Sequence, residues 1–117
     1  MVGPRGVTST NRELDEAVDL LTLAALPGVG PARVHALVAG FGGAARALVA
    51  RREHFARIAG EAAAAARSDR ELREDVRRRV GTAHAAGTVV RTWSSPWYPS
   101  PLRHLADPPP VVFLHGD

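Results

Sequence analysis

The sequence predicts a mainly α-helical domain over residues 10–87, followed over residues 88–117 by the first strands of a sheet. Two observations predict the helices: apolar residues recur at helical spacing, and two capping boxes mark helix starts. A third observation predicts the sheet, because β-branched and aromatic residues interrupted by prolines follow Gly87. Residues 1–9, rich in Gly, Pro, Ser and Thr, are expected to form a flexible tail.

The first predicted helix begins after Thr10. In the capping box Thr10-Asn11-Arg12-Glu13, the Thr10 hydroxyl accepts from the Glu13 amide and the Glu13 carboxylate reaches back to the Thr10 amide. Apolar residues at helical spacing continue to Ala25, so a helix of about four turns is expected. It ends at Pro27-Gly28.

A tight turn with two glycines follows this helix. Gly28 and Gly30 can both adopt the positive φ angles of such a turn, and Pro31 suits the first position of the next helix. The second helix is expected over residues 31–39, with Gly40 ending it. Amide N–H groups at its start, together with the helix dipole, favour binding of an anion such as phosphate.

This arrangement is typical of a helix-hairpin-helix, which contacts the backbone of nucleic acids. The expected DNA contacts are Gly28, Val29, Gly30, Ala32 and Arg33, with Val29 as a hydrophobic wedge and Arg33 as the charged group. The alternative is a plain αα-hairpin whose glycines only allow close helix packing. The motif is not a dinucleotide fingerprint, because a helix precedes it and the third glycine is absent.

The middle of the chain predicts further helices. Residues 44–66 are rich in alanine and are interrupted by Gly60, which predicts short helices. A second capping box, Ser68-Asp69-Arg70-Glu71, begins a longer helix that ends at Gly87.

The C-terminal segment predicts two strands joined by a turn-rich connection. Residues 88–93 are β-branched and aromatic, and residues 111–115 are apolar on both faces, as in a buried parallel strand. Trp93, Trp97 and Tyr98 are expected to pack the first strand and its turn, with stacking on nucleic-acid bases as the alternative. Two short strands form only a marginal sheet, so we expect this chain to be the N-terminal part of a longer protein.

The composition excludes several classes of function. The 117 residues include no Cys, which excludes disulfides and thiolate metal sites, and the five His residues lack metal-ligand spacing. No metal, cofactor or catalytic group is expected, so the protein is not expected to be an enzyme. No apolar run suits a membrane span or a signal peptide, and a cytoplasmic protein is expected.

The charge pattern indicates weak attraction to polyanions. The net charge is +3, and all 15 basic residues are Arg. Acidic residues four positions before Arg73, Arg78 and Arg79 neutralise much of the Arg77-Arg78-Arg79 run. The arginines within residues 46–57 are less balanced and are the better candidates for a phosphate contact.

Three blocks of the sequence resemble the N-terminal part of the DNA-processing protein A (DprA/Smf) family. The first is the hairpin, with Leu37 and Phe41-Gly42 after it. The other two are Tyr98-Pro99-x-x-Leu102 and the run Asp107-Pro108-Pro109-Pro110-Val111-Val112-Phe113-Leu114-x-Gly116. Their order and spacing match the family over residues 12–117.

The resemblance implies both a fold and a function. It implies a helical domain of helix-hairpin-helix or SAM-like type, followed by the entry strands of a truncated Rossmann-type α/β domain. It also implies a DNA-processing protein that binds single-stranded DNA in natural transformation and loads the recombinase. The family's main DNA site lies beyond this chain, so an accessory DNA contact is expected here. The alternative is a helical protein–protein interaction module, for a homodimer or another partner, without DNA binding of its own.

Overall fold

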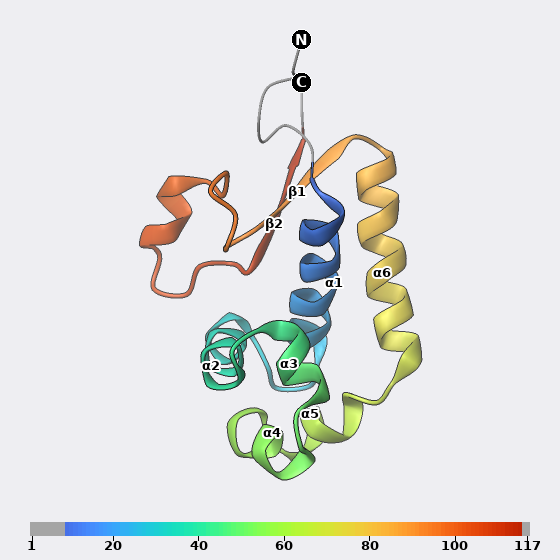
Figure 1. Ribbon diagram of the computed structural model, residues 1–117, viewed down its shortest axis with the longest axis vertical. Coiled ribbons are helices and arrows are strands. Elements are labelled where there is room, and N and C mark those ends of the chain that lie inside the picture. The colour runs from blue at the N-terminus through green and yellow to red at the C-terminus, as the bar shows by residue number, and fades with distance from the viewer. Residues whose placement is uncertain (1–8, 116–117) are drawn as a thin grey trace.

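The computed structural model describes residues 9–115, which form six α-helices, one 3₁₀ helix and two strands (Figure 1). The α-helices are α1 (Asn11–Ala25), α2 (Pro31–Phe41), α3 (Ala44–Val49), α4 (Arg52–Ala59), α5 (Glu61–Ala66) and α6 (Arg70–Ala85). The strands are β1 (Thr88–Thr92) and β2 (Val111–His115), with the 3₁₀ helix η1 (Ser100–His104) between them. None of the helices in the described residues has the length and apolar character needed to cross a membrane.

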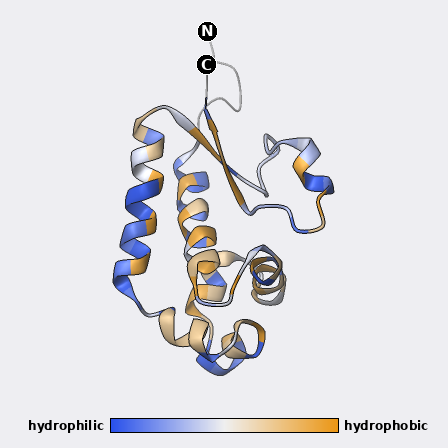
Figure 2. Cartoon of the chain, turned by 180° about the vertical axis from the view of Figure 1, so that it is seen from behind, coloured by the Kyte–Doolittle hydropathy of each residue, from blue (hydrophilic) through white to orange (hydrophobic). Residues whose placement is uncertain are grey.

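Helix α1 is the central element of the fold (Figure 1), because it contacts α2, α3, α6 and both strands. The core that α1, α2 and α4 share contains large side chains with almost no exposed surface: Leu20, Leu23, Val34, Leu37 and Phe55. Helix α6 buries only a narrow stripe, Val76 and Val80, against Val18 of α1. Figure 2 accordingly shows α6 as mostly hydrophilic.

The two strands pair in antiparallel orientation, with Val90 opposite Phe113 and Thr92 opposite Val111. The prediction of a buried parallel strand over residues 111–115 is therefore wrong, and Phe113 and Leu114 are 40% and 37% exposed. A parallel pair needs a crossover connection, usually an α-helix, whereas this connection holds only turns and η1. The coarser prediction, a helical region followed by short strands, is confirmed.

The N-terminus of α1 forms half of the predicted capping box. The Thr10 hydroxyl accepts from the Glu13 amide at 3.1 Å, as predicted. The Glu13 carboxylate does not reach back, because it contacts β1: Oε1 accepts from Arg91 at 2.8 Å and Oε2 accepts from the Thr92 amide at 3.0 Å. The start of α1 is therefore joined to the first strand.

Helix α2 is longer than predicted. It continues through Gly40 to Phe41 and ends at Gly42, whose φ of 82° is the left-handed conformation expected of Gly40. A Cβ on Gly40 would lie 3.0 Å from Cδ1 of Ile58, so Gly40 allows α2 to pack closely on α4.

Helix α6 keeps its predicted end but has a different cap. Asp69, not Ser68, occupies the N-cap position, and its Oδ1 accepts from the Glu71 amide at 2.9 Å. Gly87, with a φ of 89°, leads from the helix into β1 as predicted.

Candidate functional site

The turn of the hairpin needs glycine at only one of its two predicted positions. Gly28 has a φ of 75°, a conformation that favours glycine. Gly30 has a φ of −163°, an extended conformation that any residue can adopt. The prediction of a positive φ is therefore wrong at this position. The Val29 amide closes the turn by donating to the Leu26 carbonyl at 3.1 Å.

The side chain of Val29 lies inside the protein. It is 5% exposed and packs in the same core as Leu26, Val34 and Leu37. It anchors the turn to the helices, and of the predicted contact residues it is the one whose side chain does not reach the surface.

Helix α2 begins without a side-chain cap. Gly30 is the N-cap residue, and the Val34 amide makes the first intrahelical bond, to the Gly30 carbonyl at 2.9 Å. Ala32 and Arg33 are exposed residues of the first turn, where the helix offers no acceptor for their amides. This end of α2 therefore presents N–H groups and the positive end of the helix dipole.

Arg33 joins the hairpin to the α4–α5 segment. Its Nη1 donates to the Ala59 carbonyl at 3.2 Å, at the C-terminal end of α4. A Cβ on Gly28 or on Gly60 would lie 4.0 or 3.9 Å from the same nitrogen, so the guanidinium lies close to both glycines. This long-range contact fixes one end of the guanidinium, and Arg33 as a whole remains exposed to solvent.

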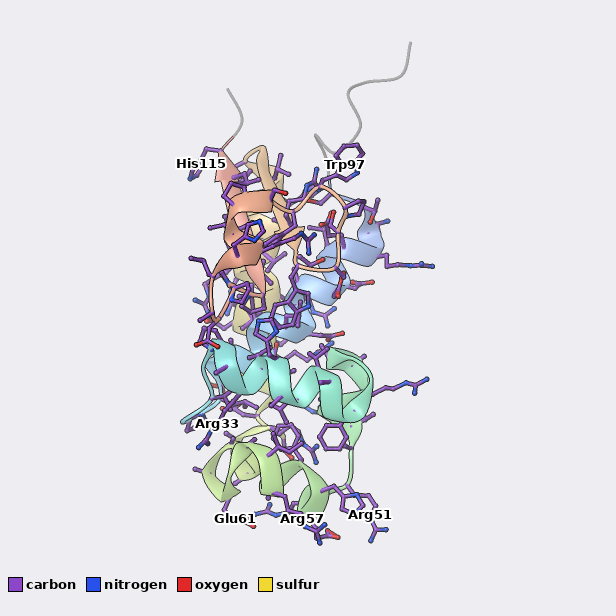
Figure 3. All side chains as sticks on the ribbon, turned by 90° about the vertical axis from the view of Figure 1, so that its left-hand side faces the viewer. Arg33, Arg51, Arg57, Glu61, Trp97 and His115 are labelled. Carbon is purple, nitrogen blue, oxygen red and sulfur yellow. The ribbon has the colours of Figure 1, made fainter. Side chains whose placement is uncertain are left out.

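Three further arginines, Arg51, Arg52 and Arg57, lie exposed on the α4–α5 segment. Figure 3 shows Arg33, Arg51 and Arg57 at the same end of the molecule. Arg51 pairs with Glu53 at 3.4 Å and Arg52 with Glu61 at 3.1 Å, both in exposed positions. We call the four arginines the arginine-rich end; against the two glutamates they leave an excess of two positive charges.

Arg67 lies near this end but has a structural role. Its guanidinium lies 4.4 Å from the centre of the Phe55 ring, and its Nη1 donates to the Ala47 carbonyl at 3.0 Å. Burial lowers the pKa of Arg67 from its ordinary value, and the positive charge of Arg52 lowers it further.

A cavity of about 350 Å³ lies between α2 and the connection from β1 to β2. It is lined by His35, Val38, Ala39, Trp93, Tyr98, Arg103 and Pro108. The rings of His35 and Trp93 stack with their centres 3.9 Å apart, and His35 Nε2 donates to the Pro108 carbonyl at 3.2 Å. These contacts fix α2 against the connection.

Tyr98 joins two of the sequence blocks that were singled out above. Its hydroxyl donates to the Pro109 carbonyl at 2.6 Å, and its side chain is almost fully buried. Burial raises the pKa of Tyr98, while the Arg103 guanidinium, 4.9 Å from the ring centre, lowers it to a smaller extent. Arg103 also donates to the Trp93 and Ser95 carbonyls at 2.8 and 2.6 Å.

The remaining residues of those blocks lie along the connection between the strands or outside the described residues. Pro99 precedes η1, and Leu102 is a half-buried residue within it. Asp107 is exposed, and Gly116 lies outside the described residues. Arg103 was missed by the sequence reasoning, because no local pattern distinguishes it from a solvated arginine.

Comparisons of the chain with protein-family models, curated proteins and solved structures give no match.

Proposed function

We propose that this chain is an accessory module that binds the phosphate backbone of single-stranded DNA through its arginine-rich end. The observation that carries the proposal is the position of Arg33 beside the uncapped N-terminus of α2. One phosphate there meets the amides of the first turn and a guanidinium together, and charge-assisted hydrogen bonds of this kind are stronger than neutral ones.

Arg51 and Arg57 extend this contact along the backbone of a bound strand. The positive excess is small, so the binding is weak, independent of base sequence and strongly dependent on salt. The resemblance to the DprA family supports a role in processing single-stranded DNA during natural transformation and in handing it to a recombinase. In that role the hairpin is an auxiliary contact, and no enzymatic activity is proposed.

The test is fluorescence anisotropy with a labelled oligothymidine at low and moderate salt. Arg33→Glu and Arg57→Glu should each weaken binding by about tenfold or more, since each reverses one charge at the contact. Arg77→Glu, on the exposed side of α6, is the charge-matched control and should bind more tightly than either. Equal affinity for Arg33→Glu, Arg57→Glu and Arg77→Glu would show that only net charge matters and would exclude the proposed contact.

A second candidate function, protein–protein interaction, is supported by the exposure of Phe113 and Leu114 on β2. These neighbouring residues point to opposite faces of an edge strand, and exposed large apolar side chains on an edge strand are typical of a site where another chain binds. Protein–protein interaction of this kind does not require DNA, so it can be tested separately from DNA binding.

A further inference from the structure

The cavity between α2 and the connection from β1 to β2 has walls that are fixed by contacts across it. The ring of His35, on α2, stacks on Trp93, and the same side chain is hydrogen-bonded to the Pro108 carbonyl. Tyr98 is held in turn by its hydrogen bond to the Pro109 carbonyl. The shape of the cavity is therefore present before any ligand binds, as in most small-molecule sites.

Most of the cavity wall is apolar or aromatic. Val38 and Ala39 line it from α2, and Trp93, Tyr98 and Pro108 line it from the connection. Its volume of about 350 Å³ lies near the lower end of the range of ligand sites, about 300–1,000 Å³. A cavity of this size and composition suits a ligand with a single aromatic ring, which can pack against the aromatic side chains in offset or edge-to-face geometry.

The same wall contains one cation, Arg103. Its guanidinium lies 4.9 Å from the centre of the Tyr98 ring and donates to the Trp93 and Ser95 carbonyls. These two bonds use fewer than half of its N–H donors, so the others can bind an anion. Within the described part of the chain Arg103 forms no ion pair, so its charge is not neutralised by a carboxylate of the protein.

We propose that this cavity binds an aromatic ring that carries a carboxylate. The ring packs against the apolar and aromatic walls, and the carboxylate accepts N–H groups of Arg103. A hydrogen bond between two ionised groups is stronger than one between neutral groups, so the carboxylate contributes much of the affinity. A free aromatic acid and the C-terminal aromatic residue of a peptide share this chemistry.

The cavity and the proposed DNA contact lie on different sides of α2. The helix turns by about 100° per residue, so Val38 and Ala39 lie roughly 140° and 120° around it from Arg33. Arg33 accordingly bonds to the end of α4, whereas the cavity faces the connection between the strands. Binding of an aromatic acid is therefore independent of the proposed DNA binding.

Nuclear magnetic resonance of the complete ¹⁵N-labelled chain tests the proposal. Its two Trp residues give two indole N–H signals, of which Trp93 lines the cavity and Trp97 does not. The probes are phenylacetate, N-acetylphenylalanine and its uncharged amide. Both acids should shift the Trp93 signal saturably and leave Trp97 nearly unchanged, and the amide should bind about tenfold more weakly or less, because it lacks the charge. Tighter binding of N-acetylphenylalanine points to a peptide end, and tighter binding of phenylacetate to a free acid.

Two variants separate the carboxylate contact from the ring contact. Arg103→Gln removes the charge but keeps an amide donor, so it should weaken both acids by about tenfold or more and abolish their advantage over the amide. Ala39→Phe fills the cavity and should weaken all three probes. Arg77→Gln and Ala65→Phe are the matched controls, because they make the same changes at exposed positions of α6 and α5, and both should bind as the wild-type chain does.

Three results would overturn the proposal: no saturable shift of the Trp93 signal, equal affinity of the wild-type chain for N-acetylphenylalanine and its amide, or unchanged binding in both Arg103→Gln and Ala39→Phe. A Trp93 signal that responds to oligothymidine but to neither acid would also overturn it, since the cavity would then accept a nucleobase. The comparison of acid with amide uses the wild-type chain alone, so it decides the matter even if a variant fails to fold. The backbone amide signals of each variant report its fold.

Discussion

Glu13 and Arg91 form an ion pair at 2.8 Å, with their side chains only 10% and 2% exposed. The pair connects the first turn of α1 to β1, and the same carboxylate also accepts from the Thr92 amide. This charged contact between distant parts of the chain attaches the sheet to the helices, together with Val90 and Val111, which pack in the helical core. Glu16 adds to it by accepting from the Thr92 hydroxyl at 2.8 Å.

We expect Glu13→Ala to destabilise the protein by about 3–5 kcal/mol, because it removes one partner of a buried ion pair. Urea unfolding followed by circular dichroism measures this loss. Glu53→Ala is the control: Glu53 pairs with Arg51 in an exposed position, where such a contact contributes about 0–1 kcal/mol. Similar losses for the two variants would show that the Glu13–Arg91 pair contributes no more than a surface pair.

Local patterns predicted the starts of α1 and α2 but not the long-range partners of the residues near them. Glu13 has the spacing of a capping box, and only the folded chain brings Arg91 close enough to take its carboxylate. The same holds for Gly40, which the local pattern treats as a helix end. Its packing against Ile58 depends on where α4 lies, and no periodicity within α2 contains that information.

For the strands too, local sequence patterns predicted the element but not its pairing. The residue types of β2 predicted a strand, and apolar residues on both faces predicted burial on both faces. Pairing orientation depends on the path of the connection, which turns back through η1 without a crossover helix. Of the candidate site, the uncapped start of α2 and the exposure of Arg33 were predictable from Gly30-Pro31 and the residue types. The contact of Arg33 with Ala59 was not.

Gly28 and Gly30 should respond differently to the same substitution. Gly28→Ala should cost about 1–3 kcal/mol, because a φ of 75° is strained for any residue with a Cβ. Gly30→Ala should cost less, about 0.5–1 kcal/mol, since Gly30 is extended and a Cβ there meets no atom within 4 Å, which leaves only the poorer N-cap preference of alanine. Chemical denaturation of the two variants measures the difference. A loss for Gly30→Ala as large as that for Gly28→Ala would contradict the turn geometry described here.

Tyr98 should make the stability depend on alkaline pH. Burial raises the pKa of Tyr98 in the folded state, so the folded protein holds the phenol proton more tightly than the unfolded chain does. The contribution of the hydroxyl is therefore complete below the unfolded-state pKa of about 10 and is lost as the pH rises through the higher folded-state pKa. Below pH 10, Tyr98→Phe should cost about 0.5–1.5 kcal/mol, because the half-buried Pro109 carbonyl loses its donor.

Urea unfolding of the wild type and Tyr98→Phe across this pH range should show the difference shrinking above about pH 10. The chain has one Tyr, so the ultraviolet absorbance of tyrosinate reports this side chain alone. A phenol that titrates at its ordinary pKa in the folded protein would count against the predicted dependence.

Gly30→Asp should separate stability from DNA binding. An aspartate at the N-cap position accepts from the amides of the first turn, so α2 should be stabilised by a few tenths of a kcal/mol relative to glycine. The same carboxylate occupies the N–H groups proposed for phosphate and adds a negative charge beside Arg33. We expect the melting temperature to rise slightly while the affinity for oligothymidine falls by about tenfold or more.

Gly30→Asn distinguishes the two effects of the aspartate, since it caps the same amides without a charge. Gly30→Asn should weaken DNA binding less than Gly30→Asp does. It removes the amide contacts to phosphate but adds no negative charge. Anisotropy titrations at two salt concentrations measure both, because the electrostatic part decreases with salt. If Gly30→Asp bound DNA as tightly as the wild type while α2 was stabilised, the phosphate site would not lie at the start of α2, and the hairpin would serve helix packing only.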